Sequence, residues 1–483
     1  MEDNLRILFI TYTHSGGGGA EAVLTNLVNH LPNYWHIDIL ETLDFSLKKE
    51  PINANINLLS PLTNIAYKMI DHMTQHMFFV HPEVIKALRE LYGYDVVIGW
   101  MYRDATFMLP AFPECKKIAW FHGMVDDLLP DYPANMTNYY ARFKLDLQRK
   151  ACSCADRILE ISNKTKASVI RVLPEFCDKL EVIYNGVDIA KILHSSEKQI
   201  DDSNAEKIYK YVLNTDKPIL ISMGKLEYNK NFSLALNALF ILKQKNIFAN
   251  YLIVGKGDVE GETTLVELVD SLGLGDRVFF MGFQQNPLPM LKGCKLLLIT
   301  SFEEGFPTVA TEAMALGIPF VTTPVAGASE ELANNEMCGL VSGWDAKEYA
   351  EKIEILLKDD VLYKKMSNVC KEHVQHFSMQ STLATFYEML ESIPKKVVKD
   401  KKIGKAYALL LFILYAPFGY IFRNKEILKF RFCVFRRQTN LVNVYKLLFR
   451  FSIFFMSILC LPLITIYSAF LTLRYKNRLF GYE

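Results

Sequence analysis

The feature that most constrains this chain is an alternation of short apolar segments and helical patterns, which runs twice along its 483 residues. The first series opens with the apolar segment 5–12, a run of glycines at 16–19 and apolar residues at helical spacing over 20–31. Short, continuous apolar strands are typical of a parallel sheet that helices cover on both faces. Strand, glycine loop and helix in this order open a doubly wound α/β domain.

The first series continues with further short apolar strands, which we predict at 36–40, 95–100, 117–122, 156–162 and 179–187. A polar stretch at about 188–215 has no strong period and predicts an interdomain linker. A second series of strands follows at 218–226, 250–257, 277–283, 295–301 and 319–323. Its helices are predicted at 232–243, 263–272 and 309–316. A last helix over 377–393 has its apolar residues on one face: Leu383, Phe386, Tyr387 and Leu390.

This pattern predicts two Rossmann-like domains that face a cleft. Ligands of such sheets bind beyond the carboxyl ends of the strands, so the loops after the strands are expected at the site. The predicted division is an N-terminal domain, a linker, a C-terminal domain, a helix that crosses back to the first domain, and a tail, at residues 1–190, 191–215, 216–376, 377–395 and 396–483.

The segment 301–321 follows an apolar strand and continues into a helix, with Glu304 and Glu312 eight residues apart. Two carboxylates so placed can accept hydrogen bonds from hydroxyls along one ligand, and Gly305 allows close backbone approach. The start of the following helix can stabilise a phosphate. Two solvated glutamates beside a turn would give the same spacing, and both alternatives stay open on spacing alone.

Lys225 and Lys230 follow a strand that ends near Gly224. Two cations at the carboxyl end of a strand suit a diphosphate, although two surface lysines would leave the same pattern. The glycine run at 16–19 can contact a phosphate through bare backbone amides or only form a tight turn. His122 ends another strand, where it could bind a sugar, stabilise charge or pack as a structural residue.

Seven elements in this order resemble the retaining GT-B glycosyltransferases of family 4, the glycosyl transferases group 1. The elements cover about residues 5–393 and are GGGGAEAVLTNL (16–27), WFHG (120–123), VIYNGVD (182–188), GKLEYNKN (224–231), LIVGKG (252–257), EGFPTVATE (304–312) and FSMQSTLATFYEML (377–390). The resemblance implies a GT-B fold in which the N-terminal domain takes the acceptor and the C-terminal domain takes a nucleotide sugar. UDP is the expected nucleotide, with GDP as the alternative.

By matching positions, the resemblance implies that Lys225 and Lys230 hold the donor diphosphate, that Glu304 contacts the transferred sugar, and that Glu312 contacts the ribose. His122 would touch the donor sugar. The remaining donor-binding positions would be Gly17, Gly18, Gly224, Gly282, Phe283, Gly305, Phe306 and Pro307. Many relatives carry Arg where Lys225 stands, and lysine keeps the charge but loses the bidentate fork.

No cofactor or metal is expected, because the chain has no Asp-x-Asp motif, no cage of acidic residues and no Cys/His cluster with zinc spacing. Retention in this family resembles front-face attack, so no enzymatic nucleophile is predicted. Asp126 could act as a base on the acceptor side, but a helix-capping role is favoured.

The tail combines positive charge with uncharged apolar runs. From residue 395 onward there are 17 Lys or Arg against three acidic residues, which leaves 37 against 50 in the rest of the chain. Residues 406–422 and 451–473 contain no charge, and the second run is long enough to span a bilayer. Basic residues before, between and after the two runs favour re-entrant or interfacial hairpins over two ordinary spans. We therefore expect a helical, membrane-anchoring tail at the cytoplasmic face of the cell membrane, and no nucleic-acid partner.

The expected function is retaining transfer of a sugar to a membrane-associated, lipid-linked glycan acceptor in surface polysaccharide synthesis. Two alternatives are a GT-B sugar-nucleotide epimerase and a non-catalytic, nucleotide-sugar-binding subunit of a transferase complex. The expected membrane tail and the paired glutamates at 304 and 312 argue against the epimerase, and the presence of both lysines and both glutamates argues against the subunit.

Overall fold

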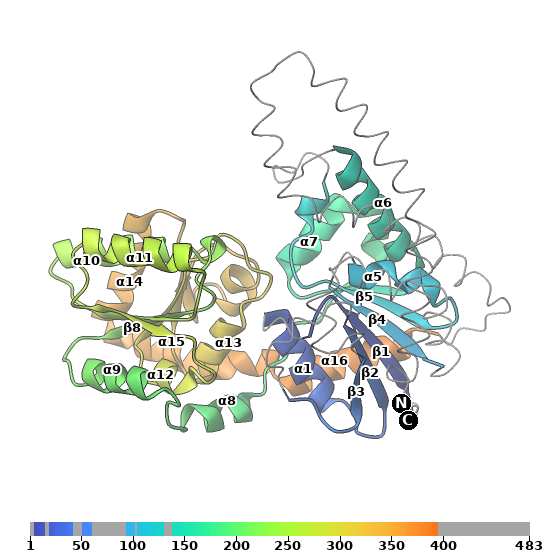
Figure 1. The fold of residues 1–483 in the computed structure, drawn as a ribbon, viewed down its shortest axis with the longest axis horizontal. Helices are drawn as coiled ribbons and strands as arrows, with labels where there is room; N and C mark the ends of the chain where they lie inside the picture. Colours follow the sequence, from blue (N-terminus) through green and yellow to red (C-terminus); the bar gives the residue numbers. More distant parts are fainter. Residues whose placement is uncertain are drawn as a thin grey trace, which may run out of the picture.

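The computed structural model describes residues 4–14, 19–41, 51–59, 93–101, 104–129 and 138–394. These residues form two α/β lobes that lie side by side (Figure 1). Each lobe contains one fully parallel sheet, which confirms the two predicted Rossmann-like domains. The predicted tail, residues 396–483, and two predicted site residues, Gly17 and Gly18, lie outside the described residues.

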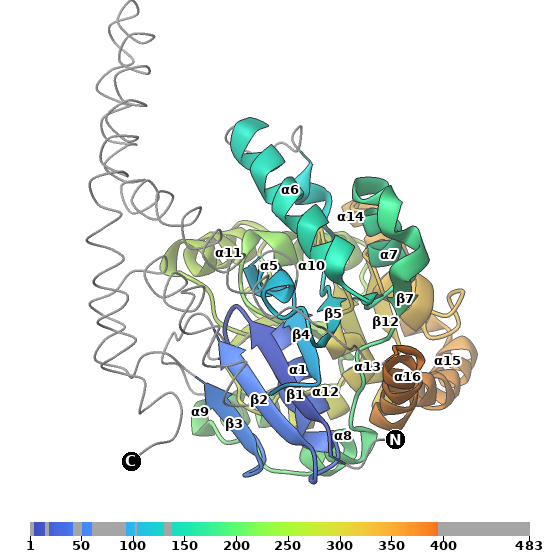
Figure 2. The same cartoon turned by 90° about the vertical axis from the view of Figure 1, so that its right-hand side faces the viewer.

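The N-terminal sheet has seven strands in the order β3-β2-β1-β4-β5-β6-β7, seen in Figure 2 in front of the other domain. The strands are β1 (Arg6–Thr11), β2 (His36–Glu41), β3 (Ile56–Leu59), β4 (Val96–Trp100), β5 (Lys116–Trp120), β6 (Arg157–Glu160) and β7 (Leu180–Val182). The edge strand β3 was not predicted, and β7 is much shorter than the expected strand at 179–187. An edge strand needs fewer apolar residues, so its sequence signal is weaker.

Side chains of β1 alternate between two hydrophobic cores, one on each face of this sheet. Ile7 and Phe9 belong to one core, while Leu8 and Ile10 belong to the other, and all four are fully buried. Burial on both faces explains why the strand is apolar without interruption. The helices of this domain are α1 (Gly19–His30), α5 (Asp104–Phe107), α6 (Asn138–Cys154) and α7 (Asn163–Val172).

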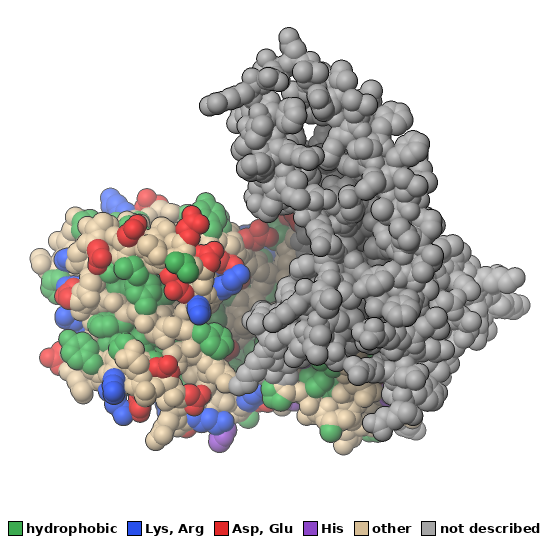
Figure 3. All heavy atoms as spheres, in the orientation of Figure 1, with side chains coloured by type: hydrophobic (Ala, Val, Ile, Leu, Met, Phe, Trp, Pro, Cys, Tyr) green, Lys and Arg blue, Asp and Glu red, His purple; other side chains and the backbone are tan. Residues whose placement is uncertain are grey.

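The C-terminal sheet has six strands in the order β10-β9-β8-β11-β12-β13. They are β8 (Ile219–Met223), β9 (Asn250–Val254), β10 (Val278–Gly282), β11 (Leu296–Ile299), β12 (Phe320–Thr322) and β13 (Gly339–Val341). The helices around them are α10 (Phe232–Gln244), α11 (Val259–Ser271), α12 (Leu288–Lys292), α13 (Thr308–Ala315), α14 (Ala346–Lys358) and α15 (Asp360–His373). On the face of this lobe seen in Figure 3, acidic, basic and apolar side chains are interspersed.

The segment 191–215, which was predicted as an interdomain linker without a strong period, lies between β7 and β8 and is mostly helical. It contains most of α8 (Ile189–Ser196) and all of α9 (Ser203–Leu213). In α9, Ala205, Tyr209 and Val212 are buried at helical spacing, and the Tyr209 hydroxyl donates to the Met290 carbonyl oxygen at 3.1 Å. The narrow apolar stripe among many charged residues hid this helix in the sequence.

The last described helix, α16 (Met379–Ser392), packs against the N-terminal domain. The ring of Phe386 stacks on Trp120 at 5.6 Å, and Tyr387 meets Trp35 edge-on at 5.6 Å. Lys116 donates to the Leu390 carbonyl oxygen at 3.0 Å. The two lobes are therefore joined twice, before β8 and through α16. Among the described residues, no helix has the length and apolar character needed to cross a bilayer.

Candidate functional site

The strand order reverses at one point in each sheet, between β1 and β4 and between β8 and β11. Loops that leave the carboxyl ends of strands on either side of such a point diverge and leave a crevice. A cleft of ≈ 730 Å³ lies there and is lined by both domains. The N-terminal domain contributes His122, Ile161 and Asn185, and the C-terminal domain contributes loops after β8, β9, β10 and β11.

Most of the predicted site residues that the structure describes are brought together in this cleft. The lining includes His122, Gly224, Lys225, Lys230, Phe283, Glu304, Gly305, Phe306 and Pro307. Gly282 is the last residue of β10, directly before Phe283. Gly19 and Ala20, which follow the glycines outside the described residues, also line the cleft.

Lys230 and Glu304 form the central ion pair of the cleft. The Lys230 ammonium lies 2.6 Å from Glu304 Oε1, and the Ser301 hydroxyl donates to the same oxygen at 2.6 Å. The two side chains are 26% and 16% exposed, so solvent screens the pair only in part. The Thr300 hydroxyl also donates to the Lys230 carbonyl oxygen at 2.7 Å, which ties the loop after β8 to the loop after β11.

Lys225 is far more exposed than Lys230. Its side chain is 71% exposed, and its ammonium lies 3.1 Å from Glu227 Oε2. An exposed pair of this kind contributes little to stability, so the Lys225 ammonium can leave Glu227 for a ligand at small cost. Lys256, which we did not predict, adds a third cation to the cleft after β9. The rule that located Lys225, a cation directly after a strand, would have located it too.

Glycine is required at two places where backbones meet. Gly255 has φ +151°, and a Cβ there would lie 1.8 Å from the Gly224 carbonyl oxygen. A Cβ on Gly305 would lie 2.8 Å from both the His122 carbonyl oxygen and Ile161 Cδ1, across the domain boundary. Gly305 therefore allows the loop after β11 to touch the N-terminal domain.

His122 lies just after the end of β5, with its ring packed against two tryptophans. The ring centroid is 4.0 Å from Trp100 and 5.9 Å from Trp120. Burial lowers the pKa of His122 to about 3, so the imidazole is neutral near pH 7. Within the described residues neither buried ring nitrogen has a hydrogen-bond partner. This environment favours a hydrogen bond to a ligand over stabilisation of negative charge by an imidazolium.

Asn185 was not predicted as a site residue. It is 5% exposed and lines the cleft, and its buried side-chain oxygen has no hydrogen-bond partner among the described residues. The residue lies within VIYNGVD (182–188), but an Asn beside a Gly is the usual composition of a turn. Only its burial in the cleft makes it a candidate for ligand binding.

Glu312 lies in α13, one turn into the helix as expected, but it is not part of the cleft lining. Burial raises the pKa of Glu312 to about 7. Its contact with a ribose therefore stays a prediction. The start of α13 does reach the cleft through Thr308 and Val309, and no side chain caps it, which leaves its first amides for an anion.

Asp126 does not cap a helix, so the favoured capping role was wrong. Asp126 begins the 3₁₀ turn at Asp126–Leu128, whose N-cap position is Val125. The Asp126 carboxylate forms an ion pair with Arg171 and accepts a hydrogen bond from the Ser168 hydroxyl at 2.7 Å. These contacts hold the carboxylate against α7, which contains both Ser168 and Arg171. No group of three or more metal-ligating side chains was found among the residues that the structure describes.

Two family models match the chain, one to each domain. Residues 17–191 match the model described as Glycosyltransferase Family 4, and residues 203–373 match Glycosyl transferases group 1. The chain is 26% identical to the capsular polysaccharide biosynthesis glycosyltransferase CapM of Staphylococcus aureus over 53% of this chain and 66% of CapM.

A second relative is a Campylobacter jejuni enzyme named GalNAc-α-(1→4)-GalNAc-α-(1→3)-diNAcBac-PP-undecaprenol α-1,4-N-acetyl-D-galactosaminyltransferase. It is 27% identical over 46% of this chain and 62% of that enzyme, so the chain spans less than two thirds of both relatives. Anabaena Alr3699/HepE in complex with UDP has a similar fold. Its TM-score is 0.63 at 18% identity, and the match covers 80% of this chain and all of HepE.

Proposed function

The chain belongs to the glycosyl transferases group 1, and from this premise we propose that it transfers a sugar from a nucleotide sugar to a lipid-linked glycan with retention of configuration. The observation that carries the proposal is the meeting of Lys225, Lys230 and Glu304 in one interdomain cleft. Cations, carboxylate and uncapped helix amides at the carboxyl ends of strands suit a sugar diphosphate.

The cations would act on the departing diphosphate. Negative charge develops on the bridging oxygen as the glycosidic bond breaks, and fixed positive groups stabilise that charge most in a site with little water. Lys230 is held in place by Glu304, and Lys225 and Lys256 lie on neighbouring loops. The first amides of α13 add partial positive charge.

Glu304 and His122 would hold the transferred sugar. Ser301 and Lys230 both contact Glu304 Oε1, which leaves Oε2 to accept a hydrogen bond from a sugar hydroxyl. The neutral His122 ring can donate through one nitrogen and accept through the other. We propose no enzymatic nucleophile: the leaving phosphate would take the proton of the acceptor hydroxyl on the same face of the sugar.

The donor is proposed to be a UDP-sugar, with GDP-sugars as the alternative. The fold that the chain shares with HepE, whose complex contains UDP, supports this choice. The name of the Campylobacter relative, which specifies an undecaprenol-linked acceptor, supports a lipid-linked acceptor here. The role of CapM in capsular polysaccharide synthesis supports a surface polysaccharide as the product.

We also propose that the basic and apolar tail holds the enzyme at the cytoplasmic face of the cell membrane, where a lipid-linked acceptor is found. Cations beside uncharged apolar runs support this proposal. Truncation after Pro394 should release the protein from membranes in a fractionation experiment while nucleotide binding remains. A truncated protein that still sediments with membranes would exclude the tail as the anchor.

The decisive experiment is a screen of detergent-solubilised enzyme against UDP- and GDP-sugars, with and without lipid-linked glycans, in which nucleotide release is measured. We expect release from a UDP-sugar that depends on an acceptor, and we expect Glu304→Ala to abolish it. Formation of an epimer from the donor alone would show that the protein is an epimerase and not a transferase. Unchanged turnover of Glu304→Ala would disprove the proposed site.

A further inference from the structure

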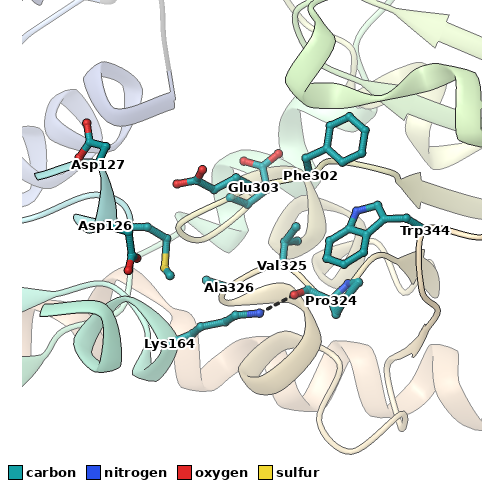
Figure 4. A pocket seen from close by; sticks show the side chains of 11 residues that line it. Asp126, Asp127, Lys164, Phe302, Glu303, Pro324, Val325, Ala326 and Trp344 are labelled. Atoms are coloured by element: carbon teal, nitrogen blue, oxygen red, sulfur yellow. Dashed lines mark hydrogen bonds between the residues drawn. The ribbon is translucent and has the colours of Figure 1, made fainter. Parts of the chain in front are cut away.

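A second interdomain pocket adjoins the cleft and is not explained by donor binding. It has a volume of ≈ 510 Å³ (Figure 4). Its lining from the N-terminal domain includes Asp126, Asp127 and Lys164, and its lining from the C-terminal domain includes Phe302, Glu303 and Trp344. Glu304 lines both cavities, so a ligand in the second pocket would lie beside the transferred sugar.

One wall of the pocket carries exposed aromatic rings, of which the Trp344 indole is held by a hydrogen bond. Phe302 is 39% exposed and Trp344 is 47% exposed. The Trp344 indole donates to the Ser301 carbonyl oxygen at 3.1 Å, and the Phe302 amide donates to the Asn229 carbonyl oxygen at 2.8 Å. Tyr228, 87% exposed, extends the wall, with its ring 5.1 Å from that of Phe302. Clustered exposed rings mark binding surfaces, and a pyranose presents an apolar face of C–H groups that fits a flat ring.

The second feature of the pocket is the negative charge of its lining. Four carboxylates line it, and the one ammonium among its described lining residues, on Lys164, donates to the Pro324 carbonyl oxygen at 2.5 Å. The charges of Asp126 and Glu304 are compensated by Arg171 and Lys230. Glu303 has no ion-pair partner in the described part of the chain, and burial, together with Asp126 and Glu304, raises its pKa.

The two cavities thus differ in charge. The donor cleft contains Lys225, Lys230 and Lys256, which attract a diphosphate, whereas the second pocket repels anions and offers oxygens that accept hydrogen bonds from hydroxyl or amide groups. The occupant that suits aromatic walls and acceptor oxygens is a polyhydroxylated ring without negative charge.

We propose that this pocket binds the sugar unit of the acceptor that receives the transferred sugar, and that it selects neutral hexoses or N-acetylhexosamines over uronic acids and phosphorylated sugars. The inference rests on the proposed glycosyl transfer, because it is the shared Glu304 that brings an acceptor hydroxyl next to the donor sugar. Both domains contribute to the pocket, so the acceptor sugar would contact the C-terminal domain as well as the N-terminal one.

Trp344 makes a binding test possible without turnover. The chain has four tryptophans, and the other three, Trp35, Trp100 and Trp120, are at most 2% exposed. The full-length protein in detergent, saturated with UDP, would be titrated with methyl glycosides of neutral hexoses, N-acetylhexosamines and hexuronic acids while tryptophan emission is recorded. We expect a saturable blue shift with at least one neutral glycoside, none with the hexuronides, and no shift in Trp344→Phe.

The absence of any Trp344-dependent shift across the panel would overturn the proposal. So would a shift of this tryptophan with vesicles of phosphatidylglycerol and phosphatidylethanolamine but not with glycosides, because the aromatic wall would then be a membrane contact. Thermal unfolding of Trp344→Phe within about 2 °C of the parent would show that the fold is intact.

Turnover provides the second test and separates the two proposals. Trp344→Ala should raise the acceptor KM at least fivefold with the donor KM unchanged, and Tyr211→Ala, an exposed ring on α9, should change neither. Glu303→Gln should raise the relative efficiency of acidic acceptors at least threefold. Acceptor-dependent turnover that is unaffected by substitution of Trp344 and Glu303 would refute the acceptor pocket but leave the proposed transferase activity. Sugar binding at Trp344 without turnover of any donor would refute the transferase activity alone.

Discussion

Replacement of Lys230 by Ala should reduce kcat far more than replacement of Lys225. The Lys230 side chain is 26% exposed and its ammonium lies 2.6 Å from Glu304, so its position and its field in the cleft are fixed before the donor binds. The Lys225 side chain is 71% exposed, and water screens the field of its ammonium. A positive group that is held in place stabilises developing charge without reorganisation, and a mobile one does not.

The magnitude follows from the loss of one preorganised group opposite an oxyanion, about 2.7–4 kcal/mol, or about 10²–10³-fold in kcat. Lys230→Ala also leaves the Glu304 carboxylate in the cleft without its partner, where it would repel the diphosphate. For Lys225→Ala we expect a loss of about 1.5–5-fold, which corresponds to the roughly 0.2–1 kcal/mol of an exposed ion pair. The double variant Lys230→Ala/Glu304→Gln should recover part of the donor affinity, because the unpaired negative charge is gone.

The assay is nucleotide release at saturating acceptor, with the donor varied to separate kcat from KM. Lys245→Ala is the matched control, because Lys245 forms a comparable 2.8 Å pair with Glu354 outside the cleft. Circular dichroism and thermal unfolding would show whether each variant is folded. A loss below threefold for folded Lys230→Ala, or a larger loss for Lys225→Ala, would refute the assigned roles.

The remaining predictions concern His122, Glu312 and Gly305. His122→Ala should lower kcat/KM about 10–100-fold. The pH profile of kcat/KM for the parent should show no titration of His122 between pH 5 and 8, because burial holds the pKa of His122 near 3. A step near pH 6.5 that disappears in the His122 variant would contradict this. Since that pKa lies below its unfolded value, the neutral ring adds no penalty above pH 6.5, and stability falls by up to about 1.4 kcal/mol per unit as the pH drops below 6.5, a slope that His122→Phe should reduce in urea titrations. The pKa of Glu312 is raised to about 7 in the folded protein, so ionisation of this residue in the unfolded chain lowers the folding stability as the pH rises from 4.5 to 7. Glu312→Gln should therefore be more stable than the parent by about 1–2 kcal/mol at pH 8 but not at pH 4.5. Equal stabilities of the two proteins at pH 8 would exclude the raised pKa. Gly305→Ala should lower kcat at least tenfold with little change in the unfolding temperature, because the added Cβ would clash with the His122 carbonyl oxygen and with Ile161 of the other domain. Gly123→Ala is the control and should behave as the parent, because a Cβ there has no atom within 4 Å.

Much of the site could be predicted because doubly wound sheets place their chemistry at the ends of strands. His122, Lys225 and Glu304 each follow an apolar strand within a few residues, and the carboxyl ends of parallel strands in one sheet all face the same way. Local sequence patterns did not reveal the helices at 189–213, whose apolar stripe is narrow. They also misplaced Asp126, whose partners Ser168 and Arg171 lie more than 40 residues further along the chain.

The sequence by itself determined the central strands of each sheet, their burial on both faces and the loops that carry charge, but not the edge strands β3 and β13. These features depend on the period of apolar residues and on what directly follows each strand. Only the tertiary structure decided which of those loops meet. The pairing of Lys230 with Glu304 joins residues 74 apart, and the acidic pocket between Asp126 and Trp344 joins two domains. Contacts of this kind depend on strand order and on how the lobes pack, and neither leaves a periodic trace in the chain.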